Sequence, residues 1–157
     1  MRLDFVVNGE SCSLEVEPWE TLVEVLRERM HLMGTKEGCG EGDCGVCIVL
    51  VDGRPVNSCL MLVVDVGGRE VETIEGLEKG GVLHPLQRAF LNKGAMQCGF
   101  CASGMILTAK AFLEEHLGTA EEEIKRGLSG VLCRCGSYKK IIEAVKMAGE
   151  EMGGRKK

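Results

Sequence analysis

Aromatic side chains are scarce in this chain. Four Phe, one Trp and one Tyr make up 4% of its 157 residues, and only three prolines are present. So few large rings leave small hydrophobic cores with few anchors, and part of the stability must come from another source. Because the same sequence contains nine cysteines, metal ligation is the obvious source.

Other absences exclude whole classes of protein. No run approaches the roughly 18 apolar residues of a membrane-spanning helix. The first residues, Met1-Arg2-Leu3-Asp4, do not open a basic segment followed by an apolar one, so we expect no secretory signal. Neither a G-x-G-x-x-G after a strand nor a P-loop is present, so no nucleotide site is indicated. Nine thiols without an export signal favour metal binding over disulfides, and a cytoplasmic protein.

Charge is distributed unevenly along the chain. Residues 1–76 contain 6 Lys and Arg against 15 Asp and Glu, a net charge of −9, whereas residues 77–157 contain 13 against 9, a net charge of +4. Either both surfaces are simply solvated, or the basic half faces an anionic group of a partner. The isoelectric point of about 5.3 argues against nucleic acid as that partner.

Short β-rich runs predict a sheet in the first half. Two pairs of such runs are each joined by a two-residue turn: residues 3–7 and 12–16 through Asn8-Gly9, and residues 48–51 and 54–57 through Asp52-Gly53. Residues 63–74 predict one or two further short strands. Thr21 and Glu24 form a capping box for a helix that continues to about Met30. Strands wrapped around one helix predict a β-grasp domain over residues 1–76.

The pattern becomes helical after a glycine-rich segment. Gly76, Gly80 and Gly81 lie within six residues and predict a linker. Four helices are predicted beyond it: from Pro85 to about Leu91, over residues 104–117, from a Thr119 and Glu122 capping box to about Ser129-Gly130, and from about Tyr138 onward. The chain is therefore predicted to be an α+β protein whose residues 77–157 form an all-α helical bundle.

Eight of the nine cysteines fall into two groups of four. The first group reads C-x4-C-x2-C with a fourth cysteine after eleven intervening residues: Cys39, Cys44, Cys47 and Cys59. This order is the plant-type ferredoxin arrangement for a [2Fe–2S] cluster. Interleaved glycines allow the loop to fold tightly and turn its amides toward an anionic cluster. Zinc is the alternative, but zinc sites usually take their cysteines as two close pairs.

The second group combines a C-x2-C pair with a C-x-C pair: Cys98, Cys101, Cys133 and Cys135. Each pair precedes a predicted helix. Two helix N-termini that converge on one anionic cluster are electrostatically favourable, because their exposed amides and dipoles attract negative charge. We therefore expect a second [2Fe–2S] cluster here, although the spacing taken alone also allows zinc.

The remaining cysteine and the three histidines have no such pattern. Cys12 alternates in phase with Leu14 and Val16, which predicts a small buried hydrophobic side chain. His31, His84 and His116 show no arrangement that resembles a metal site or a catalytic triad, so we expect them to be structural.

Taken together, the two cysteine groups resemble the iron–sulfur small subunit of the molybdenum hydroxylases, the family of xanthine dehydrogenase, aldehyde oxidoreductase and carbon monoxide dehydrogenase. The blocks that carry the resemblance are residues 37–47, residues 97–101 with Gly104-Met105, and residues 129–138. The resemblance covers about residues 3 to 147. It implies an N-terminal β-grasp ferredoxin-like domain followed by a helical [2Fe–2S] domain.

The resemblance also implies roles for particular residues. It assigns the second group of cysteines to the cluster next to a molybdenum–pterin in a separate large subunit, and the first group to the cluster nearer the electron exit. It implies that Gln97 hydrogen-bonds this pterin. Ala102-Ser103-Gly104 stands where the family often has Thr-Pro-Gly, and Gly136-Ser137-Tyr138 where it often has Thr-Gly-Tyr. No cysteine is lost, but these changes put in doubt any hydrogen bonding copied from relatives.

The implied function is electron transfer within a larger enzyme. Electrons would pass from the molybdenum–pterin centre through two [2Fe–2S] clusters to a flavin or another acceptor. The implied partners are the large subunit and a medium FAD subunit, in a hetero-oligomer such as a dimer of heterotrimers, with no substrate site in this chain. A free-standing two-cluster ferredoxin is the alternative, but it requires neither Gln97 nor a basic helical half. Carbon monoxide, aldehydes, purines, nicotinate and aromatic acyl-thioesters are all substrates of enzymes with similar small subunits.

Overall fold

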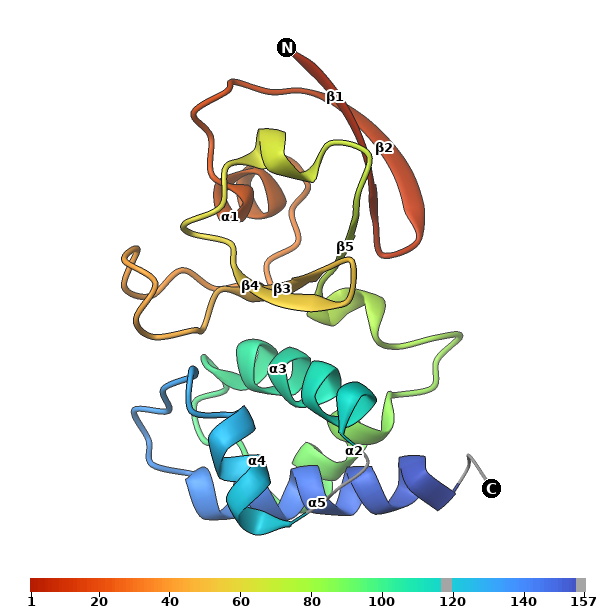
Figure 1. The fold of residues 1–157 in the computed structure, drawn as a ribbon, viewed down its shortest axis with the longest axis vertical. Helices are drawn as coiled ribbons and strands as arrows, with labels where there is room; N and C mark the ends of the chain where they lie inside the picture. Colours follow the sequence, from red (N-terminus) through yellow and green to blue (C-terminus); the bar gives the residue numbers. More distant parts are fainter. Residues whose placement is uncertain (117–119, 155–157) are drawn as a thin grey trace.

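A five-stranded mixed sheet, in the order β2-β1-β5-β3-β4, forms the first half of the molecule (Figure 1). This computed structural model describes residues 1–116 and 120–154. The strands are β1 (Arg2–Val7), β2 (Glu10–Glu15), β3 (Ile48–Val51), β4 (Arg54–Asn57) and β5 (Glu70–Glu72). β1 runs antiparallel to β2 and parallel to β5, and β3 runs antiparallel to β4 and β5. Both predicted hairpins are confirmed.

One helical segment packs against the sheet and begins at the predicted capping box. The Thr21 N–H donates to Glu24 Oε2 at 2.8 Å, and Thr21 Oγ1 accepts from the Glu24 N–H at 3.4 Å. The segment starts as α1 (Leu22–Glu24) and continues as π-helix over Val25–Arg29, where Met30 N bonds Val25 O at 3.1 Å. The extent of this helix was predicted correctly; its π-helical end was not.

The prediction of strands over residues 63–74 was wrong for its first part. Val63–Val66 forms a 3₁₀ turn, and β5 occupies three of the later residues, followed by a second 3₁₀ turn at Ile74–Gly76. The physical reason is that Val63 and Val66, three residues apart, are both completely buried in the core beneath the sheet. A strand would have placed residues three apart on opposite faces.

The second half of the chain is a four-helix bundle. It contains α2 (Pro85–Asn92), α3 (Ala102–Glu115), α4 (Glu121–Gly127) and α5 (Tyr138–Gly154). His84 caps α2, because its Nδ1 accepts from the Leu86 N–H at 3.2 Å. Thr119 lies outside the described residues, and the N-cap of α4 is Ala120, which makes no side-chain cap bond. The other three helix starts lie within two residues of the predicted positions.

The two halves share strand β3, which is buried on both faces. Val49 and Val51 belong to the core between the sheet and α1, whereas Ile48 and Leu50 belong to the core of the helical half. α3 lies across this second face of the sheet (Figure 1). β3 therefore reads as an unbroken hydrophobic run rather than an alternating one, as expected for a strand with no solvent face.

An ion pair and a backbone contact fasten α3 to the sheet half. Lys110 Nζ on α3 lies 2.9 Å from Glu72 on β5 and 2.9 Å from Glu114. Burial alone would lower the Lys110 pKa, but the hydrogen bonds that Lys110 donates to these two carboxylates outweigh it and raise the pKa. At Gly104, a Cβ would lie 2.5 Å from the carbonyl oxygen of Gly45. The two backbones can approach this closely only because Gly104 has no side chain.

Gly104→Ala should therefore destabilise the protein. The added methyl group would meet rigid backbone on the opposite half, and overpacking of this kind costs about 1–3 kcal/mol. Chemical denaturation of the purified protein measures the difference. Gly153→Ala in α5 is the matched control, because its Cβ would meet no atom within 4 Å and should not lower stability. Equal stability of Gly104→Ala and the wild type would contradict the close packing of the two halves.

Candidate iron–sulfur sites

The first four predicted ligands gather around the loop that joins the π-helical segment to β3. Cys39, Cys44 and Cys47 lie on this loop, and Cys59 follows β4. The sulfurs of Cys47 and Cys59 are 3.4 Å apart, and both residues are buried. The other two cysteines are half-buried, and the Cys44 thiol hydrogen-bonds Cys39. The four residues therefore form two sulfur pairs, one deeper than the other.

Backbone amides stabilise negative charge at the outer pair. The N–H groups of Glu41 and Cys44 donate to the Cys39 sulfur at 3.4 and 3.5 Å. These bonds lower the pKa of Cys39 to about 7. In the deeper pair, burial and the neighbouring Cys47 thiol raise the pKa of Cys59 to about 11. A bound metal would remove that proton, because a coordinating thiol is deprotonated outright.

Polar side chains and one glycine shape this loop. Asn57 Nδ2 donates to the Gly42 carbonyl at 3.1 Å, and the buried Ser58 hydroxyl donates to the Cys47 carbonyl at 2.6 Å. At Gly38 a Cβ would lie 2.9 Å from the Cys44 sulfur. Any side chain here would enter the space beside the sulfurs, so the tight cradle requires glycine.

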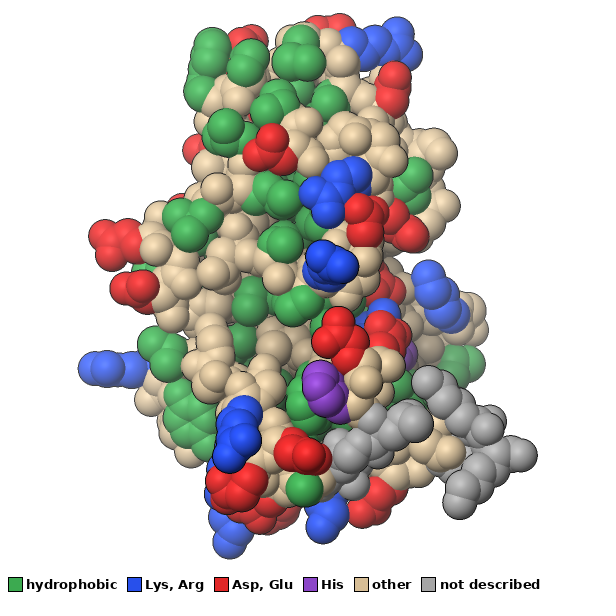
Figure 2. All heavy atoms as spheres, in the orientation of Figure 1, with side chains coloured by type: hydrophobic (Ala, Val, Ile, Leu, Met, Phe, Trp, Pro, Cys, Tyr) green, Lys and Arg blue, Asp and Glu red, His purple; other side chains and the backbone are tan. Residues whose placement is uncertain are grey.

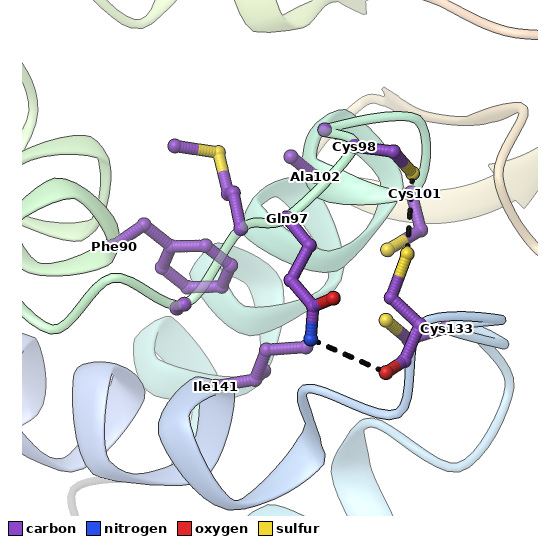
Figure 3. Close-up of a pocket in the computed structure, with 11 residues that line it drawn as sticks. Phe90, Gln97, Cys98, Cys101, Ala102, Cys133 and Ile141 are labelled. Carbon is purple, nitrogen blue, oxygen red and sulfur yellow. Dashed lines mark hydrogen bonds between the residues drawn. The ribbon is translucent and has the colours of Figure 1, made fainter.

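The second four predicted ligands come from the starts of two helices. Cys98 and Cys101 directly precede α3, with Cys101 as its N-cap, and Cys133 and Cys135 lie on the loop that precedes α5. The Cys98 and Cys135 sulfurs are 3.5 Å apart and both residues are exposed, whereas Cys101 is half-buried and Cys133 is buried (Figure 3). The predicted position of both pairs at helix N-termini is confirmed.

The inner and outer sulfurs of this group differ in their electrostatic surroundings. The Phe100 N–H, followed by Cys135, lowers the pKa of Cys98. Burial, followed by the Cys133 sulfur, raises the pKa of Cys101 to about 12. Burial also opposes ionisation of Cys133, but hydrogen bonds, first from the Ser137 N–H and then from the Cys101 thiol, outweigh it and lower the Cys133 pKa. The two inner cysteines thus have pKa values shifted in opposite directions.

This donor geometry fits a two-iron cluster in each group. A [2Fe–2S] cluster takes two thiolates on each of two irons, and the sulfurs here occur in pairs. A structural zinc ion would instead need four sulfurs converging at about 2.3 Å on one point. Within residues 1–116 and 120–154, no three His, Cys, Asp or Glu side chains converge on a position for a single metal ion.

The two groups open onto one shared hollow of about 640 Å³. Sulfur-bearing residues of both groups line it: Cys39, Cys44, Cys98, Cys101 and Cys133. A backbone hydrogen bond connects the groups at this point, because the Leu132 N–H donates to the Cys44 carbonyl at 2.9 Å. Nothing in the spacing of the cysteines predicted this link, since it joins residues 88 positions apart.

Gln97 lies at the surface beside the second group, and its amide nitrogen is already bonded. Nε2 donates to the Cys135 carbonyl at 3.3 Å (Figure 3) and also to the Ser137 hydroxyl at 3.2 Å. Oε1 makes no hydrogen bond with any described residue. Sequence reasoning singled out Gln97 but missed Ser137, and it missed the Tyr138 hydroxyl, which accepts from the Cys133 N–H at 2.8 Å. The only feature of the sequence that could have indicated Ser137 and Tyr138 is their position directly after the C-x-C pair.

The remaining candidates stand apart from both groups. Cys12 is half-buried rather than fully buried, because β2 is the edge strand of the sheet; its thiol donates to the Phe5 carbonyl at 3.4 Å. His84 caps α2, and His116 stacks on Phe112 with ring centroids 5.0 Å apart. His31 is exposed and adopts a positive φ of 57° at the turn after the π-helical segment.

Comparison with known proteins gives matches along almost the whole chain. A family model described as "2Fe-2S iron-sulfur cluster binding domain" matches residues 5–81, and one described as "[2Fe-2S] binding domain" matches residues 73–146. The aldehyde oxidoreductase iron-sulfur-binding subunit of Escherichia coli K12 is 43% identical, over 97% of this chain and 73% of that subunit. The nicotinate dehydrogenase small FeS subunit of Eubacterium barkeri is 46% identical, over 96% of each chain.

Solved structures agree with these matches. A chain of quinoline 2-oxidoreductase from Pseudomonas putida 86 superposes with a TM-score of 0.94 at 43% identity, covering 99% of this chain and 96% of that one. Aldehyde oxidoreductase from Desulfovibrio desulfuricans superposes with a TM-score of 0.93 at 38% identity, covering 98% of this chain but 17% of a much longer one. The predicted fold, a ferredoxin-like half followed by a helical half, is confirmed. With matches of this extent, the chain belongs to the iron–sulfur small-subunit family of the molybdenum hydroxylases.

Proposed function

We propose that this chain is the electron-transfer subunit of a molybdenum-containing hydroxylase, with one [2Fe–2S] cluster in each half. The observation that carries the proposal is the arrangement of eight cysteines in two groups with paired sulfurs, five of which line one shared hollow. Cys39, Cys44, Cys47 and Cys59 are the proposed ligands of the first cluster; Cys98, Cys101, Cys133 and Cys135 are those of the second. When bound, each cluster supplies a redox centre that takes up and releases one electron.

The protein's own contribution is to hold the sulfurs and offset their charge. Backbone N–H groups of the 38–47 loop bond the Cys39 sulfur, and those of the 135–137 segment bond the Cys133 sulfur. The bond from the Leu132 N–H to the Cys44 carbonyl joins the two ligand loops over a few atoms. This contact offers a short route through the protein between the two redox centres.

The surface around the second group supports a large partner subunit. Three large side chains on the rim of the hollow are well exposed: Phe100 at 45%, Leu132 at 53% and Tyr138 at 42%. Cys98 and Cys135 are exposed beside them. An apolar rim around exposed metal ligands suits a permanent protein interface better than contact with water. We propose that a molybdenum–pterin subunit covers this surface and that Gln97 Oε1 accepts a hydrogen bond from the pterin.

The loop that carries three cysteines of the first group is acidic, which suits a different partner. Acidic side chains project at the edge of the molecule where the 38–47 loop lies (Figure 2). The sequence places Glu37, Glu41 and Asp43 in or directly beside this loop. We propose that a medium FAD subunit docks here with a basic surface, and that the whole enzyme is a dimer of heterotrimers.

The location and the domain boundary are further parts of the same proposal. The cytoplasm is the proposed location, since all nine cysteines are free thiols. No helix among the described residues is long and apolar enough to cross a membrane. We place the boundary between the two cluster-binding domains at residues 76 and 77, although strand β3 belongs to both cores. A free two-cluster ferredoxin is disfavoured, because such a carrier has no use for the exposed apolar rim.

The natively isolated protein should contain about four irons and four acid-labile sulfides per chain. Two complete sets of four cysteines require this content if each holds one [2Fe–2S] cluster. Metal analysis and the visible charge-transfer spectrum measure it, and two electron paramagnetic resonance (EPR) signals should follow reduction. Stoichiometric zinc without visible absorption would refute the proposal.

Replacing Cys44 with Ser should remove one EPR signal and leave the other, because the two ligand sets lie in separate halves. Cys12→Ser is the matched control: the Cys12 sulfur belongs to neither group, so both signals should remain. If Cys44→Ser abolishes both signals in a folded protein, the assignment of ligands to two separate clusters is wrong.

The native complex should contain a molybdenum–pterin subunit and an FAD subunit. Leu132→Glu should weaken association with the molybdenum subunit by about tenfold or more (~1.4 kcal/mol), because it places a charge in the apolar rim. Leu91→Glu in α2 is the matched control, since Leu91 is 56% exposed and is not part of the lining of the hollow. Size-exclusion chromatography with molybdenum and flavin analysis measures both effects. An active monomer that carries electrons between soluble proteins would support the free ferredoxin instead.

A further inference from the structure

We infer that Gln97 is a positioning residue that sets the reduction potential of the second cluster, through hydrogen bonds from its amide to the loop carrying Cys133 and Cys135. The inference rests on the proposed function, because it requires a [2Fe–2S] cluster at this site. It assigns Gln97 a role inside its own subunit, in addition to any contact with a partner.

The amide of Gln97 joins the two chain segments that supply the exposed sulfur pair. Gln97 immediately precedes Cys98, and its Nε2 donates to the Cys135 carbonyl at 3.3 Å (Figure 3). The same Nε2 also donates to the Ser137 hydroxyl at 3.2 Å. The sulfurs of Cys98 and Cys135 are 3.5 Å apart. The glutamine side chain thus closes a ring beside the sulfur pair and limits the movement of one segment relative to the other.

The same hydrogen bonds orient the amides that contact Cys133. The peptide between Cys135 and Gly136 is planar, so fixing its carbonyl also fixes its N–H. The Ser137 N–H faces the Cys133 sulfur and is the hydrogen bond that lowers the Cys133 pKa most, whereas the Gly136 N–H donates to the Cys133 carbonyl at 3.1 Å. Gln97 therefore fixes the carbonyl of the Cys135–Gly136 peptide, whose N–H bonds the Cys133 backbone. It also fixes the hydroxyl of Ser137, the residue that supplies the N–H facing the sulfur.

Amide bonds to ligand sulfur affect the one-electron reduction of the cluster. Reduction adds one negative charge, and N–H donors stabilise the more negative form, so they raise the reduction potential. Gln97 bonds both the Cys135 carbonyl and the Ser137 hydroxyl, so it holds the segment whose Ser137 N–H faces the Cys133 sulfur. Loss of the Gln97 amide should therefore lower the potential of the second cluster and leave that of the first unchanged.

The test is a potentiometric titration of the intact native complex, with the two clusters followed separately by EPR. Gln97→Met keeps the length of the side chain and removes its donor. At a fixed potential near the midpoint, the ratio of reduced to oxidised second cluster should fall about threefold to tenfold, where tenfold corresponds to 59 mV for one electron. Ser137→Ala keeps the backbone N–H but removes one acceptor of Gln97, so it should give a smaller shift in the same direction.

Two controls separate this effect from a general loss of structure. The reduction potential of the first cluster, which should not change, serves as the internal standard in each variant. Gln87→Met replaces the chain's other glutamine, whose Oε1 accepts from the His84 N–H at the start of α2, and it should shift neither potential.

Each outcome decides the inference. An unchanged second potential in Gln97→Met, or an equal shift in Gln87→Met, overturns it. If Gln97→Met does not retain the second cluster, the Ser137→Ala variant becomes the test. An unchanged reduction potential of the second cluster in Ser137→Ala then overturns the inference. Absence of a second EPR signal from the wild-type complex contradicts the proposed function itself, which distinguishes the two failures.

Discussion

Negative charge on cysteine sulfur must be offset by N–H donors where water is excluded, and both cysteine groups depend on this constraint. Burial, together with a neighbouring cysteine, raises the pKa of Cys59 to about 11 and of Cys101 to about 12. Where backbone amides point at a sulfur, as at Cys39, the pKa instead falls to about 7. Tight glycine turns in one half and helix starts in the other are two ways for a chain to direct several amides at one point.

The second constraint is distance, because electrons pass between redox centres only when the centres lie close together. The molecule meets it by bringing the two ligand loops into direct backbone contact. Gly45 and Gly104 allow the halves to approach, and the Leu132 N–H bonds the Cys44 carbonyl at 2.9 Å. Lys110 adds an ion pair to Glu72 on the same interface. These contacts are unrelated to either hydrophobic core, yet they fix the separation of the two groups.

Local signals predicted much of this structure. Turn dipeptides marked both hairpins, a capping box marked the first helix, and cysteine spacing marked both candidate sites. The failures share one cause, which is packing that the local pattern does not encode. Val63 and Val66 turn inward as a 3₁₀ segment, and Cys12 is half-exposed because its strand lies at the edge of the sheet. The amide contacts of Gln97 could not be predicted, since Cys135 and Ser137 are about 40 positions away.

Strand β3 limits how freely these two halves can recombine. Ile48 and Leu50 pack into the helical core while Val49 and Val51 pack into the other, so neither half keeps its hydrophobic residues covered when it is removed. A chimera that joins the ferredoxin-like half of one relative to the helical half of another must therefore match β3 to α3. Although it contains two cluster-binding modules, the chain should be inherited and exchanged as one piece.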